Sequence, residues 1–313
     1  MPEPLVDFVV AGQPKSGTTA LADFLAQHPQ VCISRPKEPE FFATDLMRES
    51  DAYYGSPRYL KIRTPQQYAR CFAHGEPGQL RGEATAIYGR SREAAGNIAA
   101  HNPAAKVILI LRNPADFVHS MHMQYVNSAV EDVTDFEEAL DLEPARREGR
   151  QLPPGVRYPS ALFYSDLGRY HDQLARFVDA FPADQLLFLT NDEFRGDNIG
   201  VIQRVYRFLG VDDGFVPTVG EVHGSKAPRS ARLNRLLNAP AVRNTAHRLL
   251  PGSLYVRLSR TAHAVTLRPE QREALDPGTR ARLDAMFAED VAATSELVGV
   301  DLVRLWGLGA DSA

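Results

Sequence analysis

The segment DFVVAGQPKSGTTALADFL at residues 7–25 passes from a strand pattern to a helical pattern through a loop bounded by Gly12 and Gly17. This is the glycine spacing of the loop G-x-x-x-x-G-K-[ST], but no lysine follows Gly17, and Lys15 lies inside the loop instead. Backbone N–H groups at the start of a helix attract anions. The segment therefore predicts a phosphate-like ligand, although an ordinary tight turn containing a lysine is the alternative. Further donors would be the hydroxyl groups of Ser16, Thr18 and Thr19.

A second segment, AKVILILRNPADFVHS, places Arg112 at the end of an apolar strand and Ser120 eight residues later, two turns into a helix. Ligands of α/β proteins bind at the carboxyl edge of the sheet, and a guanidinium group matches a phosphate with two parallel hydrogen bonds. Alone, the pair is equally consistent with a surface ion pair and a helix-face serine. Together with the first loop, it indicates a second anion subsite.

PKSGTT after a strand resembles the 5′-phosphosulfate-binding loop of sulfotransferases, which use 3′-phosphoadenosine 5′-phosphosulfate (PAPS) as sulfuryl donor and release adenosine 3′,5′-bisphosphate (PAP). The strand and helix around RNP resemble the family's 3′-phosphate site. The resemblance implies that no metal takes part and that Lys15 meets the bridging oxygen of the donor. Where the family often has a second arginine, this chain has Phe117. The implied donor-binding residues are Gln13, Pro14, Lys15, Ser16, Gly17, Thr18, Thr19, Arg112 and Ser120.

A later stretch, HGSKAPRS at 223–230, resembles the family loop that closes over the nucleotide, which implicates Ser225, Lys226 and Arg229. A solvated basic loop is the alternative interpretation. We expect a cofactor-closing loop at about 220–235.

PKEPEFF resembles the K-E-x-x-F-F stretch of heparan-type sulfotransferases. The resemblance implies that Glu38 is the catalytic base, that Lys37 is a second cation, and that Phe41 and Phe42 shield the site on the substrate side. Alternatively, Lys37 and Glu38 are ordinary loop charges. Glu83, in LRGEATAIYG, is the reserve base.

The heparan-type enzymes usually have a lysine after the glutamate that matches Glu83, and here that residue is Ala84. The formal net charge is −4. Both observations argue against a highly sulfated polysaccharide and favour a small alcohol or phenol, a sugar lipid or a natural product. Nucleic acid is not an expected partner, because no global positive charge attracts it.

Strand patterns alternate with helical patterns along the chain, which predicts an α/β fold with a P-loop-like parallel sheet covered by helices on both faces. We expect a single domain over 1–313. Residues 43–75 and 125–160 should form acceptor-side loops, the second an exposed loop or lid with a short helix at DFEEAL. One continuous helix is expected over 165–182, and two helices at the end of the chain.

Apolar runs such as VILIL are too short to span a membrane. The N-terminus lacks a basic segment followed by an apolar stretch, so we expect no signal peptide and a cytoplasmic protein. Two alternatives to a sulfotransferase stay open. A P-loop kinase or NTPase would need a lysine after Gly17 and a carboxylate for Mg²⁺ at a strand end. A non-catalytic protein would bind a nucleotide or a sulfated ligand without turnover.

Overall fold

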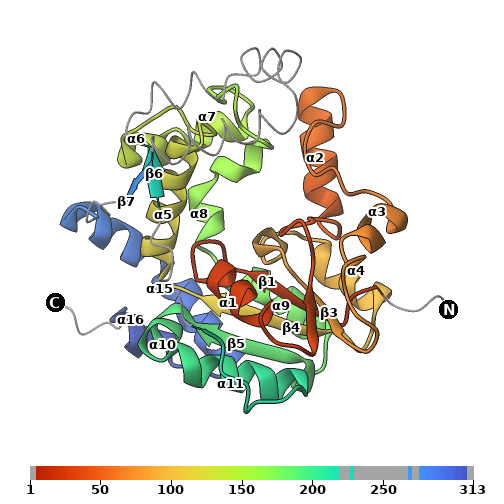
Figure 1. Cartoon of the computed structure of the whole chain (residues 1–313). Helices are drawn as coiled ribbons and strands as arrows, with labels where there is room; N and C mark the ends of the chain where they lie inside the picture. Colours follow the sequence, from red (N-terminus) through yellow and green to blue (C-terminus); the bar gives the residue numbers. More distant parts are fainter. Residues whose placement is uncertain (1–4, 219–225, 229–266, 270–274, 309–313) are drawn as a thin grey trace.

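The computed structural model describes residues 5–218, 226–228, 267–269 and 275–308 (Figure 1). Its centre is a parallel sheet of five strands in the order β2-β3-β1-β4-β5. The central position of β1 gives it a neighbour on each side: Phe8 is paired with Gly82 of β3 and with Lys106 of β4. The strands are β1 (Phe8–Gly12), β2 (Val31–Ile33), β3 (Leu80–Ala84), β4 (Lys106–Leu111) and β5 (Leu186–Thr190).

Two hydrophobic cores lie on opposite faces of this sheet. Successive side chains of a strand point to opposite faces, and accordingly Val9 belongs to one core and Val10 to the other. The Val9 core is covered by α4 (Ala94–His101), α5 (Pro114–Asn127), α9 (His171–Ala180) and α15 (Pro277–Val298). The Val10 core is covered by α1 (Thr18–Leu25), α10 (Asn191–Gly196) and α11 (Asn198–Leu209). The predicted α/β fold with helices on both faces is confirmed.

Several helix ends follow their local sequence. Thr64 caps α3 (Pro65–Arg70) and forms a reciprocal capping box with Gln67. Asn113 accepts hydrogen bonds from the first turn of α5, directly after Arg112. Helix α11 ends at Gly210, which has a left-handed φ of 82°.

The 43–75 segment contains a helix that the sequence did not lead us to expect, α2 (Thr44–Tyr54). The 127–160 segment contains the expected helix at DFEEAL, α6 (Phe136–Asp141), and also α7 (Glu143–Arg147). This second segment is not simply an exposed loop. Both side chains of the Arg146–Glu131 ion pair are fully buried, with an N–O distance of 2.7 Å.

The prediction of one continuous helix over 165–182 is wrong. Its first part, α8 (Tyr164–Leu167), ends before Gly168, and α9 begins at His171. A Cβ atom at Gly168 would lie 2.4 Å from the ring of Phe287 in α15. Glycine at 168 therefore leaves room for Phe287, and Asp290 of α15 accepts the Tyr170 N–H at 2.6 Å directly before α9 begins, so contacts with α15 favour a break at this point.

The remaining described elements are short. They are η1 (Ala86–Tyr88), η2 (Pro159–Leu162), η3 (Ala183–Gln185), α16 (Leu302–Trp306) and the antiparallel pair of β6 (Lys226–Pro228) and β7 (Leu267–Pro269). The expected helices at the C-terminal end, α15 and α16, are confirmed. In the described ranges, no helix combines the length and the apolar composition that a membrane crossing requires.

Candidate active site

The loop between β1 and α1 adopts a tightly curved backbone. Lys15 has φ 60° and Gly17 has φ 108°, both in the left-handed region. At Gly17 a Cβ atom would lie 2.9 Å from the ring of Phe194 in α10, so this position requires glycine for two reasons. A left-handed conformation at a lysine costs about 1–3 kcal/mol and is found where a site enforces it. This strained backbone is one reason to treat the loop as a candidate site.

Two of the loop side chains hold the loop in shape. The buried Gln13 side chain donates from Nε2 to Oε1 of Gln173 at 2.9 Å, which ties the loop to α9. Ser16 is also buried, and its hydroxyl donates to the carbonyl of Pro14 at 3.4 Å. Both side chains thus have partners within the protein, and their contacts with a ligand remain predictions.

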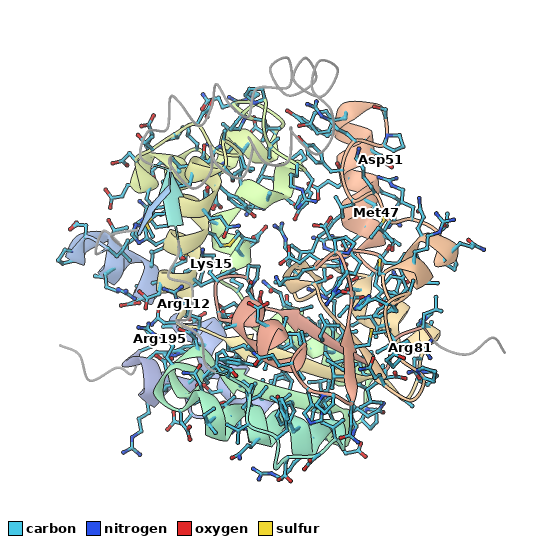
Figure 2. The ribbon with its side chains drawn as sticks, viewed as in Figure 1. Lys15, Met47, Asp51, Arg81, Arg112 and Arg195 are labelled. Carbon is cyan, nitrogen blue, oxygen red and sulfur yellow. The ribbon has the colours of Figure 1, made fainter. Side chains whose placement is uncertain are left out.

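Two side chains from other strand ends bind the carbonyl groups of the loop. Arg112 Nη1 donates to the Lys15 carbonyl at 3.0 Å, and Asn191 Nδ2 donates to the Ser16 carbonyl at 2.8 Å. The first N–H groups of α1 have no intrahelical partner. Because the carbonyls of Lys15 and Ser16 accept hydrogen bonds from Arg112 and Asn191, while the start of α1 presents N–H groups, the local polarity favours an anion; Figure 2 shows Lys15 and Arg112 close together.

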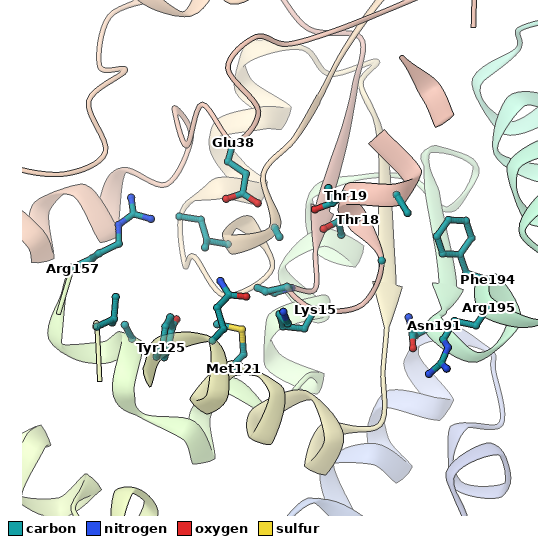
Figure 3. Close-up of a pocket in the computed structure, with 18 of the residues that line it drawn as sticks. Lys15, Thr18, Thr19, Glu38, Met121, Tyr125, Arg157, Asn191, Phe194 and Arg195 are labelled. Atoms are coloured by element: carbon teal, nitrogen blue, oxygen red, sulfur yellow. The ribbon is translucent and has the colours of Figure 1, made fainter. Parts of the chain in front are cut away.

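A cavity of about 930 Å³ lies against this loop (Figure 3). One part, which we term the loop half, is polar and is lined by Pro14, Lys15, Gly17, Thr18, Thr19, Ala20, Asn191, Phe194, Arg195 and Asn198. The other part, which we term the apolar half, is lined by Glu38, Ala86, Ile87, Met121, Gln124, Tyr125, Val130, Arg157, Tyr158 and Ala161. Figure 3 shows Arg157 and Tyr125 on one side of Lys15, and Asn191 and Arg195 on the other.

Neither Arg112 nor Ser120 is among the described residues that line the cavity. Arg112 lies beside the loop through its bond to Lys15, whereas Ser120 is a buried residue of α5. Phe117, at the position of the family's second arginine, is buried in the core with its ring centre 5.9 Å from that of Tyr170. Phe117 therefore has a packing role in this chain.

Glu38 contributes its carboxylate to the cavity from the segment after β2 (Figure 3). Its backbone is left-handed, with φ 58°. Oε1 of Glu38 lies 2.7 Å from Nζ of Lys37, and the Glu38 side chain is 39% exposed. A partly exposed carboxylate in a cavity with a cation beside it can accept a proton from a bound hydroxyl group.

The segment that carries Glu38 is fixed at three points. The Glu40 N–H donates to Oγ1 of Thr85 at 3.4 Å, and the Phe42 N–H donates to the hydroxyl of Tyr88 at 3.2 Å. Arg157 Nη2 donates to Oε2 of Glu40 at 2.8 Å. These contacts hold the loop carrying Glu38 over the end of β3.

Phe41 and Phe42 do not line the cavity. The Phe41 ring stacks on the ring of Tyr68, with centroids 4.5 Å apart, and Phe42 is buried in the core. The expected shielding of Glu38 by these two rings is therefore replaced by packing beneath its loop.

Glu83 is fully buried at the end of β3 and is absent from the cavity lining. Its carboxylate accepts hydrogen bonds from Tyr68 at 2.6 Å, from Thr85 at 2.6 Å and from Tyr88 at 3.1 Å. Burial raises the pKa of Glu83 to about 7, although the three hydroxyl donors oppose this shift. Because Thr85 and Tyr88 also hold the 38–42 segment, Glu83 supports that segment from below.

Sequence reasoning did not single out Arg157, Asn191 or Arg195, although Arg157 lies in the 125–160 segment that was expected on the acceptor side. Asn191 directly follows β5, so its place at the carboxyl edge of the sheet was a usable signal. Arg157 and Arg195 have no such local signal. Of the expected closing loop, the structure describes only 226–228, where Lys226 is paired with Pro269. Ser225 and Arg229 lie outside the described residues.

Comparison with protein families gives one model over most of the described chain. Residues 5–219 match the model described as "Sulfotransferase domain". The chain is 29% identical over 212 residues to human bifunctional heparan sulfate N-deacetylase/N-sulfotransferase 3. The matched region covers 66% of this chain and 22% of that protein. It is 28% identical over 211 residues to mouse bifunctional heparan sulfate N-deacetylase/N-sulfotransferase 4, with the same coverage. The chain thus spans about a fifth of the length of these relatives.

Among solved structures, the fold is similar to that of a sulfotransferase from Alicyclobacillus acidocaldarius. The TM-score is 0.69 with 24% sequence identity, and the match covers 97% of this chain and 99% of the other. This likeness agrees with the fold of the residues that the structure describes.

Proposed function

Because the chain belongs to the sulfotransferase domain family, we propose that it moves a sulfuryl group from PAPS to a hydroxyl group. The acceptor would be a small molecule, a natural product, or a glycan or glycolipid. The observation that carries the proposal is that Lys15 of the loop and the Glu38 carboxylate line one cavity. A cytoplasmic location remains a prediction from the sequence.

The loop half has the chemistry that a phosphosulfate donor needs. Gly17 permits the left-handed turn of the loop, Thr18 and Thr19 line the cavity with hydroxyl groups, and Lys15 adds a cation. Arg112 lies beside this loop, as a residue for the 3′-phosphate requires. Ser120 and the 225–229 residues remain predicted contacts of the nucleotide.

When bound, PAPS would supply an electrophilic sulfuryl group on a phosphate leaving group. The Lys15 ammonium group would neutralise the negative charge that develops on the bridging oxygen. A fixed cation at that position stabilises the transition state more than the ground state, which is the requirement for catalysis.

Glu38 would accept the proton of the acceptor hydroxyl group at a carboxylate oxygen. The acceptor oxygen forms a bond to sulfur, and the bond between sulfur and the bridging oxygen breaks with its electron pair left on PAP. The products are a sulfate ester, PAP and protonated Glu38, so atoms and charge balance. Lys37, in contact with Glu38, would hold the carboxylate in place.

The test compares Glu38→Gln with Lys15→Ala. Glu38→Gln should lower the rate of sulfuryl transfer by about 10²–10⁴-fold and leave PAP affinity in calorimetry unchanged, because the base does not touch the nucleotide. Lys15→Ala should lower the rate by about 10²–10³-fold.

Glu76→Gln, at an exposed glutamate outside the cavity, is the control and should behave as wild type. Full transfer activity in Glu38→Gln would contradict the assignment of the base. Hydrolysis of ATP that depends on Mg²⁺, without transfer from PAPS, would favour a P-loop NTPase instead.

A further inference from the structure

The apolar half of the cavity contains few charges. Among the described residues that line it, only Glu38 and Arg157 are charged, and the others are Gln124 and apolar or tyrosine side chains. The guanidinium group of Arg157 therefore decides whether this half attracts an anion.

Arg157 already has an anionic partner from the same protein. Its Nη2 donates to Oε2 of Glu40 at 2.8 Å, and the side chains are 33% and 10% exposed respectively. The guanidinium carbon also lies 5.6 Å from the ring centre of Tyr59. Burial by itself would lower the pKa of Arg157, but the hydrogen bond and negative charge of Glu40 outweigh it and raise the pKa.

The backbone around Arg157 is held in place by α2. The hydroxyl group of Ser50 donates to the Arg157 carbonyl at 2.8 Å, and the Ser160 N–H donates to Oε1 of Glu49 at 2.7 Å. Glu40 is fixed on the other side through its N–H bond to Thr85. Because both partners are anchored, the ion pair is a built part of the cavity wall.

Lys37, another cation near this half, is paired in the same way, since it lies against Glu38. A third cation, Arg90, is not among the described lining residues; it lies 5.2 Å from the ring centre of Tyr158 and is linked through the Ser160 hydroxyl to the carboxylate of Glu49. These three cations are thus matched by three carboxylates. An anionic acceptor entering it would lose hydration and would meet a guanidinium group that is already neutralised. It would also approach the carboxylates of Glu38 and Glu40.

We propose that Glu40 is a specificity-determining residue, which neutralises Arg157 and thereby restricts the acceptor to uncharged hydroxyl compounds with an apolar or aromatic body. This inference rests on the proposed function. The acceptor that it implies differs from heparan sulfate, which appears in the names of the relatives.

The test uses two matched probes, methyl 6-hydroxy-2-naphthoate and 6-hydroxy-2-naphthoate, which differ by one negative charge. Their affinities for the PAP-saturated protein are measured by naphthol fluorescence, and kcat/KM is measured with PAPS. Wild type should prefer the ester at least tenfold. Glu40→Gln should reduce this preference at least tenfold, mainly through tighter binding of the carboxylate probe to the released Arg157.

Two further variants separate specificity from folding. Arg157→Gln should give no gain for the carboxylate probe, because the released cation is absent. Glu49→Gln removes a carboxylate that anchors the same segment without contacting Arg157, and its preference should match that of wild type. PAP affinity and thermal unfolding of each variant report on the rest of the site.

The inference is overturned if wild type prefers the carboxylate probe, if Glu40→Gln leaves the preference unchanged, or if neither probe binds to the PAP-saturated protein. Failure of the proposed function has a different signature, in which wild type does not bind PAP. Binding of PAP together with preferred transfer to the anionic probe overturns only the specificity of the apolar half.

Discussion

The guanidinium group of Arg112 donates a hydrogen bond to the backbone carbonyl of Lys15 at 3.0 Å, although the two residues are 97 positions apart in the chain. They follow neighbouring strands, β1 and β4, whose carboxyl ends meet at one edge of the sheet. Arg112 therefore has two possible roles, to bind an anion and to fix the conformation of the loop that carries Lys15.

Replacement of Arg112 should separate these two roles. Arg112→Ala should weaken PAP binding about 10–100-fold, because a hydrogen bond to a charged group contributes about 1.5–3 kcal/mol. AMP lacks the 3′-phosphate, so wild type should prefer PAP to AMP and the variant should lose that preference. Calorimetric titration with both nucleotides measures the ratio. An unchanged ratio with both affinities lowered would assign Arg112 to loop support alone.

Replacement of Gly17 should damage the loop without removing a functional group. Gly17→Ala puts a side chain at φ 108° and within 2.9 Å of Phe194, so we expect destabilisation of about 1 kcal/mol or more and weaker PAP binding. Gly96→Ala is the matched control, since its Cβ would meet nothing within 4 Å and it lies inside α4. That control should stabilise the protein by about 0.5–1 kcal/mol. Urea unfolding measures both, and equal stability of the two variants would speak against the strained geometry at Gly17.

Glu83 should make the stability of the protein depend on pH. Burial raises its pKa to about 7 in the folded state, from an ordinary value of 4.5. The folded state therefore holds this proton more tightly than the unfolded chain does. The stabilising contribution is complete below about pH 4.5, decreases as pH rises, and is lost above about pH 7.

The measurement is the difference in unfolding free energy between wild type and Glu83→Gln from pH 5 to pH 8. Wild type should lose up to about 3 kcal/mol relative to the variant over the full titration, with no further change above pH 7.5 or so. A difference that does not vary with pH would show that the folded protein does not raise the pKa of Glu83.

The sequence was most informative where one short segment forms a complete unit. The loop between β1 and α1 contains its glycines and its lysine within one short stretch of sequence. The strand before it and the helix after it have clear apolar periods. The capping box of Thr64 and Gln67 is equally local. Such features need no knowledge of distant contacts, so they could be predicted.

Features that depend on distant contacts could not be predicted in this way. Arg157 reaches the cavity only because α2 and Glu40 hold its segment. Arg146 and Glu131 lie in a segment whose composition is typical of an exposed loop, but their mutual ion pair allows both side chains to be buried. The break at Gly168 arises from a helix more than a hundred residues later in the chain. In each case a tertiary contact overrides the local pattern.

The two halves of the cavity differ in how they are built. Arg112 and Asn191 directly follow strands of the sheet, and Lys15 lies in the loop that follows β1. Arg157 instead lies in a connecting segment that is anchored by hydrogen bonds to α2. Substitutions or insertions around Arg157 leave the strands untouched. Substitutions during evolution can therefore change the residues around the acceptor while the residues of the proposed donor site are retained. Related chains can then differ in the acceptor that they sulfate and still bind the donor in the same way.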